Sequence, residues 1–294
     1  MANDPSWELY RSYLGVLREG SLSGAARSLG LAQPTVGRHI EALETSLGLA
    51  LFTRSPSGLL PTPAALELKP HAEAMGHAAA ALLRAAGSQG EVKGSVRISA
   101  SEVIGAEVLP PIVARLRAAH PGLQVELVLT NRVEDLLRRE ADIAVRMTRP
   151  RQDALLARHV GVIEVGLHAH RRYLRERGTP RAFADLAHHA LIGFDEETPF
   201  IRAASKTAPG WRRQAFSLRT DSDLAQLALI RAGAGIGVCQ VELARSHRDL
   251  VRVLADDFAY RMDTWVTMHE DLRHSPRCKA AFDALAQGLQ QHIG

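Results

Sequence analysis

Polar side chains gather at the start of one short helical pattern, QPTVGRHIEALETSL, which spans residues 33–47. Val36, Ile40 and Leu43 recur in it at helical spacing and predict a single buried stripe. The residues off this stripe near the start of the helix are Gln33, Pro34, Thr35, Arg38 and His39. Amide, hydroxyl, guanidinium and imidazole groups in the first turns of a helix can hydrogen-bond base edges and phosphates. The stretch therefore predicts a surface that reads DNA.

A second set of residues follows apolar strand patterns in the later part of the chain. In open α/β sheets, ligands lie beyond the carboxyl ends of the strands, against helix N-termini. The residues in such places are Ser99, Ser101, Glu102, Asn131, Arg146, Phe194, Thr220 and Asp221. Each of them alone could equally be a helix cap or part of a satisfied loop. Their convergence at one edge predicts a cleft that binds a small molecule.

The chemistry of this cleft favours a small polar effector that carries a carboxylate. Helices expected after Ala100 and Thr220 would present backbone N–H groups to an anion, and Arg146 would add a charged hydrogen bond. Glu102 and Asp221 stand at the same helix starts and would repel a bare anion. Either these acids cap their helices and face away, or they bind the amine of a zwitterion. Capping is the favoured alternative.

Two other motifs are weaker candidates for chemistry. The HAH stretch places His168 and His170 on one strand face, but no cysteine or carboxylate nearby completes a zinc site. The GAGIG stretch precedes a strand, whereas a dinucleotide fingerprint follows one, so it predicts a tight turn. We therefore expect neither a metal nor a cofactor, and no nucleophile motif predicts an enzyme.

The helical pattern at 33–47 follows closely on another at 22–29. Leu22, Ala25, Ala26 and Leu29 predict an apolar face there, and Gly30 is a typical helix stop. So short a gap forces the two helices to cross steeply, and the alanines let their backbones approach. This is the geometry of a helix-turn-helix, in which Ser23 of the first helix is also placed to contact DNA.

An earlier helix and a later hairpin complete this part. Trp7, Tyr10, Leu14 and Leu17 form an apolar stripe that ends at Gly20. After residue 50, two apolar runs flank RSPSG and predict a hairpin, or wing. Its tip would carry two further candidates for DNA contact, Arg54 and Ser57.

The order and spacing of these motifs resemble the N-terminal domain of the LysR-type transcriptional regulators. The matching elements include Ala25-Ala26, Gln33-Pro34, Leu43-Glu44, Leu47-Gly48 and Leu51-Phe52-x-Arg54. Gly37 departs from the serine usual in the family, and Ala65 departs from the usual glycine. The resemblance implies a regulator that binds double-stranded DNA, with RNA polymerase as a further partner. It extends weakly over the remaining chain.

A long helix with a heptad seam follows the wing. The seam residues are Leu68, Ala72, Met75, Ala79, Leu82 and Ala86. A narrow, alanine-rich stripe favours a close partner helix over packing on its own domain, so the seam predicts a homodimer. Pro70 should kink this helix or mark its start. The resemblance implies the same dimer and adds that two dimers commonly form a tetramer.

From Val92 strands alternate with helices, which predicts parallel α/β sheets. The resemblance implies a two-lobed fold similar to periplasmic binding proteins. The expected fold class is therefore α/β, with a winged helix-turn-helix, a linker helix and a two-lobed effector-binding domain. We place these at residues 1–61, 62–90 and 91–294. Lobe I is expected at about 92–163 plus 269–294, and lobe II at about 164–268.

Composition fits this scheme without deciding it. The 294 residues carry a net charge of +4, which hints at a polyanionic partner. Two cysteines make no disulfide framework, and neither a secretory signal nor a membrane-spanning run is expected, which points to the cytoplasm. The alternative is a ligand-binding protein or an enzyme of the α/β class in which the N-terminal helices serve only dimerisation.

Overall fold

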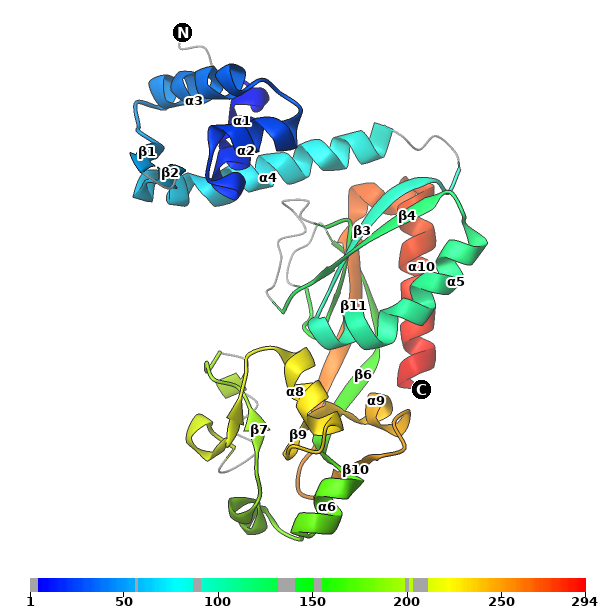
Figure 1. The fold of residues 1–294 in the computed structure, drawn as a ribbon. Helices are drawn as coiled ribbons and strands as arrows, with labels where there is room; N and C mark the ends of the chain where they lie inside the picture. The colour runs from blue at the N-terminus through cyan, green and yellow to red at the C-terminus, as the bar shows by residue number, and fades with distance from the viewer. Residues whose placement is uncertain are drawn as a thin grey trace. The chain divides into compact units, whose positions relative to one another are not determined.

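The protein is described here by a computed structural model, which covers residues 5–55, 58–86, 91–131, 141–150, 155–198, 201–202 and 211–294. The chain divides into two compact units, the first of which ends at Ala86. Figure 1 labels the elements of both units. Within the described parts of the chain, every helix is too short or too polar to span a lipid bilayer.

The first unit is a winged helix-turn-helix followed by a long helix. Its elements are α1 (Trp7–Glu19), α2 (Leu22–Leu29), α3 (Gln33–Leu47), β1 (Phe52–Ser55), β2 (Gly58–Pro61) and α4 (Pro63–Ala86). Gly30 ends α2 in the left-handed conformation, with φ at 68°, and lets the chain turn directly into α3. The expected helices, their tight turn and the antiparallel hairpin are confirmed.

The core of this unit is built where α1, α2 and α3 approach closely. Val36 and Leu43 are fully buried, and Ile40 nearly so, as their helical spacing predicts. A Cβ at Gly15 of α1 would meet Cδ1 of Leu29 at 2.9 Å, so the Leu29 side chain packs directly against the backbone of α1. Ala65 is also fully buried, and its carbonyl accepts a hydrogen bond from the Tyr13 hydroxyl. The departure from glycine at 65 is therefore accommodated.

The first half of α4 packs on its own domain, which corrects part of the predicted seam. Ala72 is buried in the core of the first unit, and Leu68 packs against that core. Farther along, a Cβ at Gly76 would lie 3.3 Å from the Trp7 ring of α1. Ala72 is thus enclosed within its own unit, and Leu68 is half-buried against the same core. Pro70 lies inside α4, which starts at Pro63.

Other apolar side chains of α4 are exposed to solvent, and two of them belong to the predicted seam. Met75 is 41% exposed and Leu82 is 66% exposed, while Ala79 is half-buried. The side chain of Ala86 lies outside the described residues. Leu66, outside the predicted seam, is also exposed.

The second unit contains a seven-stranded mixed sheet and a separate two-stranded one. Its first elements are β3 (Gly94–Ala100), the π-helix η1 (Ile104–Val108), α5 (Leu109–Ala119), β4 (Leu123–Leu129), β5 (Ile143–Arg146), β6 (Leu155–His170) and α6 (Arg171–Arg177). Next come η3 (Phe183–His188), β7 (Ile192–Gly193), η4 (Arg213–Ala215), β8 (Leu218–Arg219), α8 (Asp223–Arg231) and β9 (Ile236–Gln240). The last are α9 (Val241–Arg245), β10 (Leu250–Val253), β11 (Tyr260–His269), η5 (Glu270–His274) and α10 (Pro276–Ile293).

The expectation of parallel sheets is only partly right. The large sheet has the strand order β10-β6-β11-β5-β3-β4, with β9 also paired to β6. β3 is parallel to β4 and β5, and β7 is parallel to β8. β6, in contrast, pairs antiparallel with β9, β10 and β11. The α/β class therefore holds, but the sheet is mixed.

Two lobes share this sheet, and the long strands β6 and β11 cross between them (Figure 1). In lobe I, α5 and α10 pack on β3, β5 and the adjoining parts of β6 and β11. Lobe II contains two smaller cores, one around Trp211 and Phe216 and one around Leu227 and Ile230. Cys278 lies in the core of lobe I and Cys239 in lobe II, in keeping with the absence of a disulfide framework.

The crossing points differ from the predicted lobe boundaries. In β6 the change of core falls between Val165 and Leu167, close to the predicted 163/164. In β11, however, Met262, Val266 and Met268 all belong to the core of lobe I. The second crossing therefore lies near residue 261 and not at 268/269, because β11 continues the sheet of lobe I beside β5.

Candidate DNA interface and effector cleft

The start of α3 presents a polar, exposed face. Gln33, Pro34 and Arg38 are exposed, and Thr35 is half-buried. Pro34 occupies the first turn of the helix, where its missing N–H costs no hydrogen bond. Ser23, in α2, is half-buried. These polar side chains therefore belong to the two helices of the helix-turn-helix. Val36, Ile40 and Leu43 are buried and hold α3 on the core of the unit.

His39 is held differently from the other candidates of α3. Its Nδ1 lies 2.7 Å from the hydroxyl of Ser12, a buried residue of α1. This bond ties the imidazole to the neighbouring helix, so that only its Nε2 is left for a partner. The structure thus gives His39 a positioning contact that the sequence did not predict.

Gly37 lies in the middle of α3 with space beside it. A Cβ built there would meet only one side-chain atom within 4 Å, the Cδ1 of Leu22 at 3.8 Å. No close packing requires glycine at this position, so the fold would also accept alanine or serine.

The wing is fixed at both of its ends. The Glu44 carboxylate accepts hydrogen bonds from the backbone N–H groups of Leu51 and Phe52, at 2.6 and 3.2 Å. At the other strand, Leu59 N–H donates to the Gly20 carbonyl at 2.9 Å. Arg54 is exposed on β1, as a phosphate contact requires. Ser57, the other predicted wing contact, lies outside the described residues.

Five of the predicted effector residues lie at or just after the ends of β3, β4 and β5. Arg146 donates to the Ser99 hydroxyl at 2.6 Å, and Ser101 is buried beside Met147. Asn131 accepts a hydrogen bond from the Glu102 N–H at 3.2 Å.

Glu102 does cap a helix, but the helix belongs to the other lobe. Its carboxylate accepts hydrogen bonds from the Ser222 hydroxyl and the Leu224 N–H, at 3.0 and 3.4 Å. Asn131 reaches the same helix, because its amide nitrogen donates to Asp223 at 3.0 Å. The expectation that Glu102 caps the helix it precedes is therefore corrected. The residue bridges the lobes instead.

Asp223 of lobe II has two polar neighbours on lobe I, Asn131 and Glu102. Desolvation raises the pKa of Asp223, as does repulsion by the Glu102 carboxylate. The hydrogen bond from Asn131 acts in the opposite direction and lowers the pKa of Asp223.

The remaining predicted residues of lobe II do not line the cleft in the expected way. Phe194 is buried in the core of lobe II, where its ring packs edge-on against Phe216 at 5.0 Å, so it supports the fold. Asp221 accepts hydrogen bonds from the N–H groups of Asp195 and Glu196, both at 2.9 Å. The Thr220 hydroxyl accepts one from Ser222 N–H at 3.3 Å. Asp221 therefore orders a loop. It does not cap α8, whose capping residue is Ser222, so the capping alternative is wrong for Asp221.

A second contact between the lobes was missed entirely. Arg231, the last residue of α8, donates to both carboxylate oxygens of Glu107, at 2.9 and 2.7 Å. The hydrogen bond from Arg231 lowers the pKa of Glu107, against the opposing effect of partial burial. Local sequence carries no signal for this pair, whereas Ser222-Asp223 before an apolar run is a recognisable helix start.

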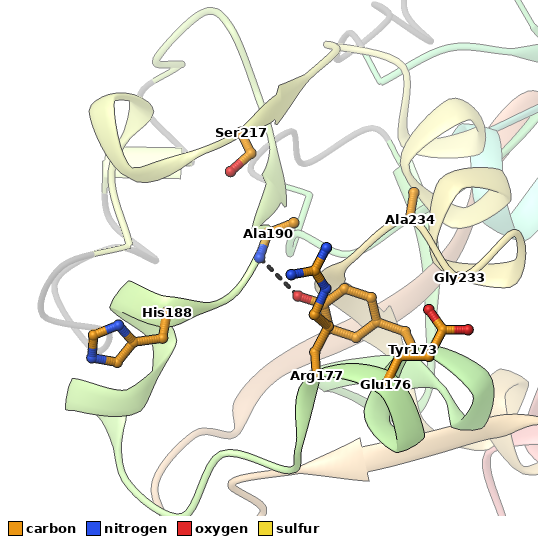
Figure 2. A pocket seen from close by; sticks show the side chains of 8 residues that line it. All are labelled: Tyr173, Glu176, Arg177, His188, Ala190, Ser217, Gly233 and Ala234. Carbon is orange, nitrogen blue, oxygen red and sulfur yellow. Dashed lines mark hydrogen bonds between the residues drawn. The ribbon is translucent and has the colours of Figure 1, made fainter.

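One cavity lies apart from the cleft, in lobe II (Figure 2). It measures about 330 Å³ and is lined by Tyr173, Glu176, Arg177, His188, Ala190, Ser217, Gly233 and Ala234. The Tyr173 hydroxyl accepts a hydrogen bond from the Ala190 N–H at 2.8 Å, which Figure 2 shows. No predicted effector residue lines this cavity.

The HAH and GAGIG stretches, the weaker candidates for chemistry, make contacts that support the fold. His168 is buried and its Nδ1 donates to the Gly166 carbonyl at 2.9 Å, while His170 Nδ1 accepts from Arg172 N–H. Gly233 turns the chain from α8 toward β9 with φ at 73°. Among the residues that the structure describes, no three His, Cys, Asp or Glu side chains come together as a metal site requires.

Comparison with known families settles the relationship of the chain. Residues 7–66 match the bacterial regulatory helix-turn-helix protein, lysR family, and residues 89–290 match the LysR substrate binding domain. The protein belongs to the LysR family. It is thus a DNA-binding transcriptional regulator whose activity is controlled through an effector-binding domain, and the alternative of an N-terminal part that serves only dimerisation is not favoured.

Individual LysR-type proteins resemble the chain along its whole length. The regulator LtrA of Klebsiella pneumoniae is 26% identical over 288 residues, 94% of this chain and 92% of its own. CbnR, a LysR family regulator of known structure, has a TM-score of 0.67 at 20% identity, covering 98% of this chain and 99% of its own. AphB of Vibrio cholerae has a TM-score of 0.61 at 20% identity, covering 96% and 99%. At this identity the two structures show the shared LysR-type fold.

Proposed function

We propose that this LysR-type regulator reads its operator with the exposed start of α3 and with the wing. The observation that carries this assignment is the polar face of α3, where Gln33, Thr35 and Arg38 lie over the buried stripe. CbnR, a structural relative, is known as a complex with its target DNA. In such a helix the first turns lie in the major groove and Arg38 donates to guanine or phosphate.

Binding to DNA from upstream of the coding region tests this assignment. In a gel-shift titration, Arg38→Ala and Thr35→Ala should each weaken specific binding by about 1–3 kcal/mol, without loss of the fold by circular dichroism. Lys69→Ala is the matched control, because Lys69 is a basic residue of α4 that pairs with Glu73. Full specific affinity in both α3 variants would show that another surface reads the operator.

We propose that the effector is a small polar molecule with a carboxylate, bound between the lobes. Two observations support this chemistry. Arg146 donates to Ser99 where β5 and β3 end. The Ser222 hydroxyl at the start of α8 already donates to one carboxylate, that of Glu102. A guanidinium and a helix N-terminus both favour an anion.

A thermal-shift screen of carboxylates and matched neutral amides on the full-length protein tests the effector class. A ligand at a hundred times its Kd adds about 2.7 kcal/mol to the stability of the folded state. Arg146→Ala should abolish the shift given by a carboxylate, and Arg115→Ala, at an exposed site on α5, should preserve it. Stabilisation by uncharged compounds only would contradict the proposal.

We propose further that the regulator is a homodimer joined through α4, and that dimers associate into a tetramer. The exposed Met75 and Leu82 support a partner helix on this face. A bacterial regulator of this kind would act in the cytoplasm, where the DNA lies, and would work by binding and not by catalysis. Contact with RNA polymerase, which the resemblance implied, stays a prediction.

A further inference from the structure

Helix α8 of lobe II is held at both ends by carboxylates of lobe I. At its N-terminus, Glu102 binds the hydroxyl of the capping residue Ser222 and the N–H of Leu224. At its C-terminus, Arg231 makes a two-pronged ion pair with Glu107. In Figure 1, α8 lies on the side of lobe II that faces lobe I. The two contacts therefore join lobe I to both ends of the same helix of lobe II.

The electrostatics of the helix favour a carboxylate at the first contact. The N-terminus of a helix carries a partial positive charge and unpaired N–H groups, and α8 is nine residues long. Glu102 fills this place as a bound anion would. Asn131 strengthens the arrangement, since it links the Glu102 N–H to the Asp223 carboxylate.

The second contact is half-buried. The side chains of Arg231 and Glu107 are 31% and 24% exposed, and the paired oxygens lie within 2.9 Å of the guanidinium nitrogens. Arg231 also lies 2.7 Å from Nε2 of His247, which orients the guanidinium from within lobe II. A two-pronged arginine–carboxylate pair of this kind has a defined geometry as well as charge.

The segment that carries the two carboxylates is itself firmly placed. Glu102 lies two residues before the π-helix Ile104–Val108, and Glu107 lies within it. π-Helical turns are frequent at functional sites. A Cβ at Gly105 would meet the Leu129 side chain at 2.0 Å, so this turn is pressed against β4. Val103, between the two carboxylates, packs on the small core of lobe II that includes Leu227 and Ile230.

We propose that these contacts form a latch between the lobes, residues Glu102, Asn131 and Glu107 on lobe I and Ser222, Asp223 and Arg231 on lobe II, and that Glu102 is an internal competitor of the effector. The latch holds the lobes together when no effector is bound. An effector carboxylate that takes the start of α8 displaces Glu102 and releases this end of the latch. The inference rests on the proposed effector cleft, and it names the residue that the effector must replace.

Hydrogen–deuterium exchange on the full-length protein tests the latch directly. Glu102→Ala should raise exchange at the Leu224 and Ala225 amides on the order of tenfold, because the start of α8 loses a charged acceptor. Glu102→Gln, which keeps an acceptor oxygen, should give an intermediate rise. Glu270→Ala, at an exposed site in η5, is the control and should leave α8 unchanged. Native exchange rates in Glu102→Ala, with the fold intact by circular dichroism, would overturn the latch.

Acetate serves as the probe of the competition. In Glu102→Ala, millimolar acetate should restore protection at Leu224, whereas chloride at equal ionic strength should not. The native protein should need at least ten times more acetate for any change. Equal acetate dependence in both proteins would contradict a competitor role for Glu102.

A charge exchange tests the other end of the latch. Glu107→Arg alone should raise exchange in the last turn of α8, and the double change Glu107→Arg with Arg231→Glu should recover part of the protection. No recovery in the double variant would mean that the pair does not hold the lobes. If carboxylates stabilise the native protein through Arg146 while Glu102→Ala exchanges normally, the effector site stands and the latch is wrong. If instead Glu102→Ala exchanges faster and no carboxylate stabilises the native protein, the latch is supported and the carboxylate effector is refuted.

Discussion

The carboxylate of Glu44, near the end of α3, accepts a hydrogen bond from the backbone N–H of Leu51 at 2.6 Å. The same oxygen accepts a second bond from Phe52, the first residue of the wing, at 3.2 Å. Leu51 is fully buried, so its N–H has no access to water in the folded unit. One side chain of the recognition helix therefore fixes where the wing begins.

Glu44→Ala should lower the free energy of unfolding of the DNA-binding unit by about 1–3 kcal/mol, because a buried donor loses its acceptor. Urea denaturation followed by circular dichroism measures the change. Glu41→Ala, an exposed position on the same helix, should stay close to the native value. Equal effects of the two substitutions would mean that the Glu44 bonds contribute nothing to stability.

Gly37→Ala should stabilise the first unit by about 1 kcal/mol, since glycine is the poorer residue inside a helix and the site has room for a methyl group. Gly24→Ala in α2 provides the contrast, because its Cβ would lie 2.8 Å from the Cβ of Glu19, an atom fixed by the backbone, and should destabilise the same unit. Urea unfolding of both variants gives the two signs. A destabilised Gly37→Ala would show that the helix needs glycine for a reason other than packing.

Arg54→Ala should weaken binding to all DNA sequences alike. A phosphate contact carries no sequence information, and its loss should reduce the slope of log K against log salt by about 0.9. Fluorescence anisotropy at four salt concentrations, with operator and scrambled duplexes, measures this slope. Loss of binding to the operator alone would instead place Arg54 against a base.

Met75→Glu combined with Leu82→Glu should separate the subunits, because it places like charges on the exposed apolar face of α4. Light scattering after size-exclusion chromatography gives the mass of the assembly. His71→Glu puts the same charge at another exposed position of α4 and should preserve the assembly. An unchanged mass in the double variant would exclude this face as the interface.

His168 should make the protein less stable as the pH falls from about 6.5 to 4. Burial, the largest effect, lowers the pKa of His168 to about 4, with a further lowering by Arg252 and an opposing effect of the Gly166 hydrogen bond. In that range His168 binds a proton in the unfolded chain and stays neutral in the folded protein. The free energy of unfolding should fall by up to about 1.4 kcal/mol per pH unit, on the order of 3 kcal/mol in all.

Urea denaturation at several pH values tests this contribution. His168→Gln should show a shallower dependence on pH than the native protein, whatever its absolute stability. His188→Gln, at an exposed position, should keep the native slope. Parallel curves for His168→Gln and the native protein would mean that His168 ionises as readily folded as unfolded.

The helix-turn-helix could be predicted from sequence because its signals are local. Apolar positions three and four residues apart fix the buried face of α3, and Gly30 marks the turn that separates it from α2. The strand directions could not be predicted in this way, since β6 pairs with β11 about a hundred residues later, as the bond between His159 and Asp263 shows. An alternation of strands and helices along the sequence does not indicate which distant strands pair.

The gathering of polar residues at one sheet edge could be predicted from sequence, and their role toward an effector stays a prediction. The ends of β3, β4 and β5 do carry Ser99, Asn131 and Arg146, because strand ends in a parallel arrangement meet at one edge. The partner of Glu102, however, is 120 residues away, and only the folded chain brings Ser222 to it. Phe194 follows a strand of two residues, which is too short for alternation to tell its inward face from its outward one.

The helix α10 completes lobe I from the far end of the chain. Its buried Arg277 donates to the carbonyl of Ser95 in β3, 182 positions earlier. A ribosome adds about 5–20 residues per second, so on the order of ten to forty seconds separate the synthesis of these two partners. The buried core residues of the first unit all lie between Tyr13 and Ala72. On each nascent chain, the core of the DNA-binding unit is therefore synthesised well before lobe I of the effector-binding domain is complete.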